Sequence, residues 1–308
     1  MKTTKHTTRM KIDPQEYTFL LRGLVMGDRI NPNRLIVVLI DGLSNEVAQR
    51  QLGYMEGLVE EGAALRARVK SVLPSLSRPC YASIFTGTSP RVHGVNTNEP
   101  TARLETLSVF DVLAEASHTS AVAGYHWMSE LFSRGPYDLV RDVEQNHNES
   151  GITHGRFYHQ DEYPDAQLFA LAERMRRTEN PDLLVIHPMG CDHAGHKHGG
   201  ESREYAGRAA FMDGILATVL PVWMREGYQI IVTADHGMNA FGFHGGPDEA
   251  ERITPFYLIS QRLSSSRVTQ DTIEQTELSA LFCDLLEVVP SATMRPFSPS
   301  RKAQWFGL

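Results

Sequence analysis

The sequence predicts an α/β fold in which helices cover both faces of an open, mostly parallel sheet. Three apolar, β-branched runs carry this prediction: LIVVLID at 35–41, LLVIH at 183–187 and QIIVTAD at 229–235. Continuous apolar runs of this length are typical of strands buried on both faces of a parallel sheet. Segments with helical periodicity alternate with them, as in doubly wound folds.

The remaining elements follow from periodicity and punctuation. A helix is expected over 45–61, between the N-cap residue Ser44 and Gly62. A fourth strand is expected over 119–125, and further helices over 107–117, 166–178 and 203–226. Pro221 predicts a kink or a break in the last helix, because proline cannot donate the backbone hydrogen bond.

The segment 98–163 has no clear strand periodicity in its second half, which is rich in Gly, His, Asn and Asp. We interpret this segment as an insertion near the active site, in the form of a small cap. No Pro/Ser-rich linker divides the chain, so we expect residues 1–308 to form a single domain.

Composition limits the partners and the location. The formal net charge of −7, without a basic stripe, excludes a protein that coats nucleic acid. No run approaches the roughly 20 apolar residues that span a bilayer, so no membrane partner is expected. The three cysteines form no CxxC pair and the N-terminus is polar, which favours a reducing compartment and a cytoplasmic protein. The oligomeric state is left open.

Acidic and imidazole side chains gather where the predicted strands end. A single aspartate at such a place is usually a turn former or a helix cap. Here several fall at the carboxyl ends of strands or in glycine-rich turns, where open α/β sheets place their functional groups. Zinc accepts this mixture of nitrogen and oxygen donors, and manganese or iron could also use it. The candidate ligands are Asp41, Asp192, His196, Asp235, His236 and His244.

Ser77 is the candidate nucleophile. It stands two residues before Pro79, at the expected entrance of a short helix that ends at Gly87. The helix dipole favours an alkoxide there, and free backbone N–H groups can hold a phosphate. The alternative is that Ser77 only caps the helix. Because the chain has no GxSxG motif, a serine–histidine–acid triad lacks support and metal coordination is the available means of activation.

Taken in order, the motifs resemble those of the alkaline phosphatase superfamily. They are IDG, S-x-P followed by TG, P-x-x-H-G-V, D-x-x-x-H, ADHGM and HGG, from about residue 35 to residue 244. The chain is most similar to the type I phosphodiesterase/nucleotide pyrophosphatase branch. The resemblance implies a three-layer α/β sandwich and two divalent metal ions, most often Zn²⁺. It assigns Asp41, Ser77, Asp235 and His236 to one metal and Asp192, His196 and His244 to the other.

The resemblance also implies a phosphodiesterase or nucleotide pyrophosphatase that hydrolyses a small-molecule phosphoric ester through a phosphoseryl intermediate on Ser77. Asn98 falls where this branch has an asparagine that binds a nonbridging phosphate oxygen. The residue after the nucleophile, often aromatic in nucleotide-cleaving members, is Arg78 here, which could bind a second negative charge on the substrate. A phosphonate or phosphomonoester hydrolase, a sulfatase and a non-catalytic metal-binding protein are therefore alternatives.

Overall fold

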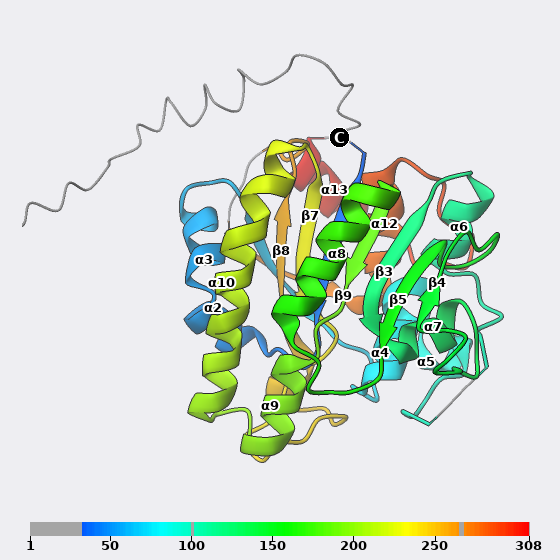
Figure 1. Ribbon diagram of the computed structural model, residues 1–308. Coiled ribbons are helices and arrows are strands. Elements are labelled where there is room, and N and C mark those ends of the chain that lie inside the picture. The colour runs from blue at the N-terminus through cyan, green and yellow to red at the C-terminus, as the bar shows by residue number, and fades with distance from the viewer. Residues whose placement is uncertain (1–32, 100–101, 265–267, 308) are drawn as a thin grey trace, which may run out of the picture. The chain divides into compact units, whose positions relative to one another are not determined.

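The computed structural model describes residues 33–99, 102–264 and 268–307. Their centre is a nine-stranded sheet, drawn in Figure 1, in which all strands except β4 and β8 run in the same direction. The predicted mostly parallel α/β sheet is thus confirmed. In spatial order the strands are β4 (Glu144–Gln145), β5 (His154–Tyr158), β3 (Ser120–Tyr125), β6 (Leu183–Ile186), β1 (Leu35–Ile40), β7 (Gln229–Ala234), β8 (Ile253–Ile259), β2 (Leu65–Lys70) and β9 (Val268–Glu274).

Two hydrophobic clusters lie on the two faces of this sheet and give the fold its three layers. Alternate residues of β1 divide between them: Leu35, Val37 and Leu39 join one cluster, and Ile36, Val38 and Ile40 join the other. Because successive side chains of a strand point to opposite faces, a strand covered on both sides must be apolar throughout. All six residues of β1 are fully buried.

Helices cover both faces. The cluster of Ile36 includes side chains of α2 (Asn45–Gln51), α3 (Gly53–Glu60), α8 (Asp165–Glu179), α9 (Gly190–His198) and α10 (Arg203–Arg225), which lie in front of the sheet in Figure 1. The cluster of Leu35 includes α4 (Ser77–Thr86), α6 (Val109–Glu115), α7 (His126–Phe132), α12 (Leu278–Leu286) and α13 (Pro299–Phe306). Three short helices, α5 (Pro90–His93), α11 (Glu249–Arg252) and η1 (Gln275–Glu277), lie between longer elements.

The four predicted strands are present within one residue of their expected bounds, but one helix prediction is wrong and another is corrected in part. The segment 45–61 forms two helices that meet at Leu52, because the first N–H groups of α3, on Tyr54 and Met55, donate to the carboxylate of Asp213 on α10. Such a tertiary cap is invisible in the local sequence. The other helix, α10, does not break at Pro221 but runs through it without interruption.

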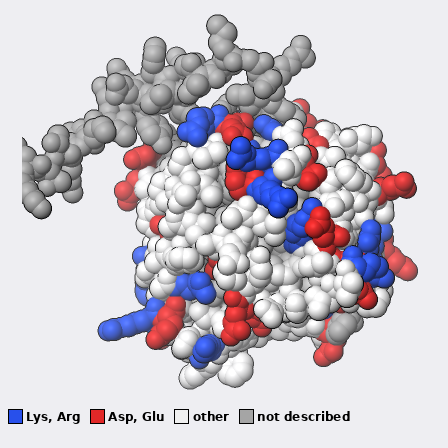
Figure 2. All heavy atoms as spheres, in the orientation of Figure 1, with Lys and Arg blue, Asp and Glu red and all other residues white. Residues whose placement is uncertain are grey.

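The segment 98–163 contributes β3, β5 and β4, which extend one side of the sheet, together with α6 and α7. A single domain over residues 1–308 stays a prediction, since residues 1–32 lie outside the described part of the chain. On the face in Figure 2, acidic and basic side chains are interspersed, in line with the absence of a basic stripe in the sequence. Within the described residues, no helix is both long and apolar enough to cross a membrane.

Candidate metal centre

The sheet order explains why residues far apart in the sequence meet. Strands β6, β1 and β7 are parallel neighbours, so their carboxyl ends share one edge of the sheet. Asp41 follows β1, Asp235 and His236 follow β7, and Asp192 and His196 stand on α9 after β6. All the predicted ligands are therefore brought to one place, as expected for the crevice of an open α/β sheet.

One group of possible ligands consists of Asp41, Asp235 and His236, each fully buried. The Nε2 atom of His236 is 3.4 Å from Asp41 Oδ1 and 3.2 Å from Asp235 Oδ2. It is also 3.0 Å from the hydroxyl of Ser77. One ion could contact all four side chains, because their donor atoms already converge on one point.

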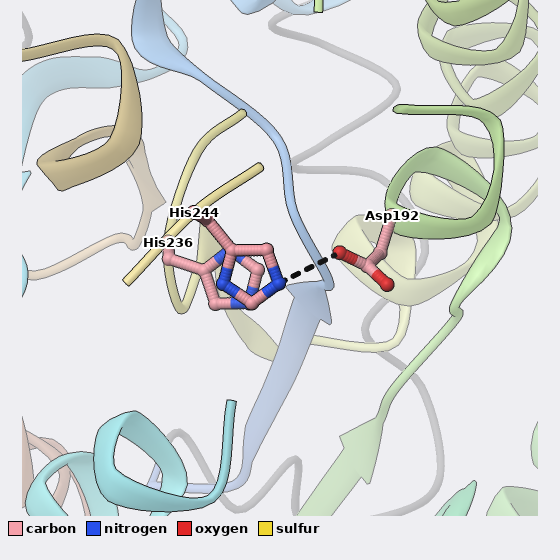
Figure 3. Close-up of side chains that lie close together, drawn as sticks. All are labelled: Asp192, His236 and His244. Carbon is pink, nitrogen blue, oxygen red and sulfur yellow. Dashed lines mark ion pairs between the residues drawn. The ribbon is translucent and has the colours of Figure 1, made fainter. Parts of the chain in front are cut away.

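The second group consists of Asp192, His236 and His244, shown in Figure 3. The rings of His236 and His244 stack with their centroids 3.7 Å apart, and His244 Nε2 is 3.6 Å from Asp192 Oδ1. His196 completes this group, since its Nε2 atom lies 3.4 Å from Asp192 Oδ1 and 3.1 Å from His244 Nε2. His236 thus lies within reach of both groups, whereas the resemblance assigned it to one.

Close packing of the backbone makes this approach possible. Gly42, directly after Asp41, has φ = +67°, which favours glycine. A Cβ atom there would lie 2.8 Å from the Cα atom of Asp192. The backbone N–H of Gly42 also donates to Asp235 Oδ1 at 3.1 Å, so this residue links the ends of β1, β7 and α9.

Ser77 is the first residue of α4 and is buried among the ligand candidates. The helix begins two residues earlier than the sequence suggested, with the extended residue Leu76 as its N-cap, so Ser77 itself does not cap it. The carboxamide oxygen of Asn98 accepts a hydrogen bond from the backbone N–H of Arg78 at 3.0 Å. Asn98 therefore lies beside the nucleophile candidate, as its predicted role requires.

The pKa values of the three buried carboxylates differ because their electrostatic surroundings differ. Burial opposes the charge on Asp41, but hydrogen bonds from His187 and Tyr81 lower its pKa to about 2. Burial and repulsion from the ionised Asp41 raise the pKa values of Asp192 and Asp235 well above the usual range. Three buried carboxylates this close together need positive charge in order to ionise together.

The donor set fits divalent cations. Asp41 Oδ1, Asp192 Oδ1 and Asp235 Oδ2 are buried, and none has a hydrogen-bond partner among the described residues. Burial lowers the pKa of His236 and lowers that of His244 to about 3, so both imidazoles are neutral and can donate a lone pair. Buried oxygen atoms without partners are costly, and a bound metal removes that cost. Carboxylate and imidazole ligands in this mixture suit zinc.

Two residues near Asp41 were missed by the sequence analysis. His187 Nε2 lies 3.0 Å from Asp41 Oδ2, and its Nδ1 atom accepts a hydrogen bond from the backbone N–H of Tyr125 at 3.3 Å. The hydroxyl of Tyr81 donates to the same Asp41 oxygen. His187 ends the second apolar run, at 183–187, so its position was a usable signal, whereas Tyr81 lies in the middle of α4 with no distinguishing pattern.

Arg78 pairs with a carboxylate outside the two ligand groups. Its guanidinium Nη2 atom contacts Glu130 Oε2, and the two side chains are 1% and 6% exposed. The guanidinium also lies over the ring of Trp127, 4.5 Å from its centroid. A substrate anion would have to compete with this buried carboxylate, and binding of a substrate charge by Arg78 stays a prediction.

The comparisons with known proteins agree on the family and the fold. The family described as type I phosphodiesterase / nucleotide pyrophosphatase matches residues 35–256. Murine ectonucleotide pyrophosphatase / phosphodiesterase 5 superimposes with a TM-score of 0.69 at 13% identity, over 88% of this chain and 98% of that one. The three-layer sandwich expected from the resemblance is confirmed by this likeness.

Among curated proteins, a GPI ethanolamine phosphate transferase 2 of Kluyveromyces lactis is 25% identical over 75% of this chain and 29% of its own length. The human catalytic subunit of the same name is 24% identical over 80% of this chain and 26% of its own. The chain thus spans less than a third of either relative. Both relatives are named as transferases of ethanolamine phosphate to GPI. They contradict the expected cytoplasmic location and the restriction to hydrolysis.

Proposed function

Because the chain belongs to the type I phosphodiesterase/nucleotide pyrophosphatase family, we propose that it is a metal-dependent enzyme that breaks a phosphoric ester bond with Ser77. A single observation carries the proposal. The Ser77 hydroxyl lies 3.0 Å from His236 Nε2, and His236 belongs to both groups of converging carboxylates and imidazoles. A serine that only capped a helix would not need to lie among these possible metal ligands.

The first group of ligands (Asp41, Ser77, Asp235 and His236) and the second (Asp192, His196 and His244) would each hold one divalent cation. Such a pair activates the attacking hydroxyl and neutralises charge on the leaving oxygen. Ser77 Oγ forms the new bond to phosphorus while the bond to the leaving oxygen breaks. Ser77 is the first residue of α4, where the helix dipole favours negative charge on its oxygen.

The second step removes the phosphoryl group from Ser77 and restores the hydroxyl. The acceptor can be water or the hydroxyl of an alcohol. The curated relatives named above favour an alcohol that carries a lipid, with ethanolamine phosphate as the transferred group. Both acceptors follow the same chemistry on Ser77, so the proposal for the first step does not depend on which of them is used.

Phosphodiesters suit this site better than dianionic phosphomonoesters. The cation next to Ser77, on Arg78, is already matched by Glu130. The neutral side chain of Asn98, which bonds the backbone beside Ser77, is then the group positioned for a nonbridging phosphate oxygen. A diester carries one negative charge in this place and needs no second basic side chain.

The test combines metal content with turnover. We expect about two metal ions per chain and turnover of a nitrophenyl phosphodiester in excess of the monoester, the phosphonate ester and the sulfate ester. Ser77→Ala should abolish turnover but keep bound metal through the remaining ligands. The matched control is Ser89→Ala, because Ser89 is exposed and its side chain makes no capping bond.

Protein that remains metal-free and inactive after zinc or manganese is added would refute the proposal. Addition of glycerol to the assay separates the acceptors. If nitrophenol is released but the phosphoryl group appears on glycerol in excess of its molar share, the enzyme is a transferase. If water receives the group in proportion to its concentration, hydrolysis is the activity.

A further inference from the structure

The loop that follows β7 carries two phenylalanine side chains into solvent beside the candidate metal centre. Phe241 is 84% exposed and Phe243 is 65% exposed, although the neighbouring His244 is a predicted ligand. We define residues 239–243 (NAFGF) as the phenylalanine loop. Two large apolar rings exposed together on one short loop are a candidate contact surface, unlike apolar side chains that are exposed singly.

The backbone of the phenylalanine loop is held rigidly. The side chain of Asn239 accepts hydrogen bonds from the N–H groups of Phe241 and Phe243 at 2.9 and 3.0 Å, and its amide group donates to the buried Glu251. Asn239 N–H also donates to the carbonyl of Phe243. These hydrogen bonds fix the backbone that carries the two rings, so the rings are held in their exposed positions.

The backbone of the loop supports the metal centre, whereas the side chains of Phe241 and Phe243 face solvent. The carbonyl of Gly242 lies 2.8 Å from His196 Nδ1, which leaves His196 Nε2 to face Asp192 and His244. Gly242 has φ = +81°, and a Cβ atom there would lie 2.9 Å from the carbonyl of Gly195 on α9. Any surface that the two rings contact therefore lies close to the candidate metal centre.

A third exposed apolar side chain comes from the adjoining loop. Leu73, 46% exposed, precedes Ser75, which forms an isolated β-bridge with Gly245 and whose carbonyl lies 3.0 Å from His244 Nδ1. Leu73 therefore belongs to the loop before Ser77, and Phe241 and Phe243 to the loop before His244. We call these three exposed side chains, on the two loops joined by the Ser75–Gly245 bridge, the apolar rim.

We infer that this apolar rim inserts into a lipid–water interface and holds the site against a lipid surface. The rings project outwards and line none of three cavities in the described part of the chain, although Ala240 of the same loop borders one of them. A small ligand needs a concave pocket, whereas a fluid lipid surface accepts projecting apolar side chains.

The charge next to the apolar rim also favours a lipid surface as its partner. Lys197 and His198 are exposed on the last turn of α9. The next residues, Gly199 and Gly200, pack against the phenylalanine loop, and Gly200 N–H donates to the carbonyl of Asn239 at 2.8 Å. A cation beside apolar tips fits an interface that contains anionic headgroups. The consequence of this inference rests on the proposed function: the phosphoester that Ser77 attacks, or its acceptor, is linked to a lipid.

The experiment measures co-sedimentation of the full chain with vesicles of phosphatidylcholine that contain one quarter phosphatidylserine. We expect binding, and a loss of about tenfold or more in the Phe241→Ser/Phe243→Ser variant, because two apolar rings no longer leave water. The matched control is Val289→Ser. Val289 is 86% exposed and lies two residues after Glu287, which accepts a hydrogen bond from Asn33 near the start of β1, at the opposite end of the sheet from the site.

The inference would be overturned by absence of vesicle binding in the unaltered protein, or by equal binding of the double variant. A dimer in sedimentation velocity that the double variant dissolves would also overturn it, because the rim would then contact a second copy. Turnover of a soluble nitrophenyl diester should stay within about twofold in the double variant. Vesicle binding without such turnover would refute the proposed function alone, and turnover without vesicle binding would refute this inference alone.

Discussion

Removal of the carboxylate that faces Arg78 should destabilise the protein far more than a surface change would. In Glu130→Gln the side chain keeps its size but loses its charge, so the buried guanidinium of Arg78 has no counter-ion. Arg78 Nε and Nη1 have no hydrogen-bond partner among the described residues, so no other group replaces Glu130. Loss of one partner of a buried ion pair costs about 3–5 kcal/mol, and we expect about 3 kcal/mol here.

Urea unfolding measures this change, with Glu46→Gln as the matched control. Glu46 pairs with Arg50 on the surface, where the side chains are about 70% exposed, and the expected cost is below about 0.5 kcal/mol. The double variant Arg78→Met/Glu130→Leu should lose no more stability than either of its single variants, Arg78→Met and Glu130→Leu, because no unpaired charge remains. The coupling energy from this cycle should be about 3 kcal/mol, at the upper end for contacting residues.

The same variants separate two roles for Arg78. If the guanidinium only supports the start of α4, Arg78→Met lowers turnover of monoesters and diesters by a similar factor, since Ser77 and Asn98 shift together. A selective loss of monoester turnover with a change in unfolding free energy below about 1 kcal/mol would refute our reasoning. Arg78 would then bind the second charge of the substrate.

Three further predictions concern the surroundings of the site. Gly42→Ala should weaken metal binding and lower the free energy of unfolding by about 2 kcal/mol or more, because the backbone conformation and the contact with Asp192 both exclude a Cβ atom. Metal titration and urea unfolding measure the two effects, and unchanged metal affinity would contradict this prediction. His187→Asn should weaken metal binding about 10- to 100-fold at unchanged ligands, since His187 orients Asp41. His93 is buried with its pKa lowered to about 4, so its neutral form stabilises the fold fully above the unfolded value of about 6.5. Acidification from pH 7.5 to 5.5 should therefore cost about 1 kcal/mol of unfolding free energy that His93→Gln does not lose.

The fold was predictable where local pattern and tertiary structure agree. The apolar run at 35–41 could only be a strand covered on both faces, and β1 has this environment. Strand β2 escaped prediction because LRARVK alternates apolar and basic residues over only six positions. The division of 45–61 into two helices depends on Asp213, more than 150 residues away, so no local signal could reveal it.

The candidate site was likewise predictable from the sequence only in part. The ends of apolar strands and the glycine-rich turns located every candidate ligand, because the topology of a parallel sheet brings these ends together. The environment of Arg78 could not be predicted, since its partner Glu130 comes from a helix 52 positions further along the chain with no motif of its own. The exposure of Phe241 and Phe243 was equally hidden, because an aromatic residue in a loop is as often buried.

The most direct test of the account is a search for a covalent adduct on Ser77. Metal-loaded protein is mixed with a nitrophenyl phosphodiester, quenched in acid within the first turnover and digested, and the peptide with Ser77 is analysed by mass spectrometry. The account predicts that this peptide carries the phosphoryl group with its remaining ester substituent, and that Ser89→Ala protein gives the same adduct. Turnover without any adduct on Ser77, or undiminished turnover in Ser77→Ala, would contradict it.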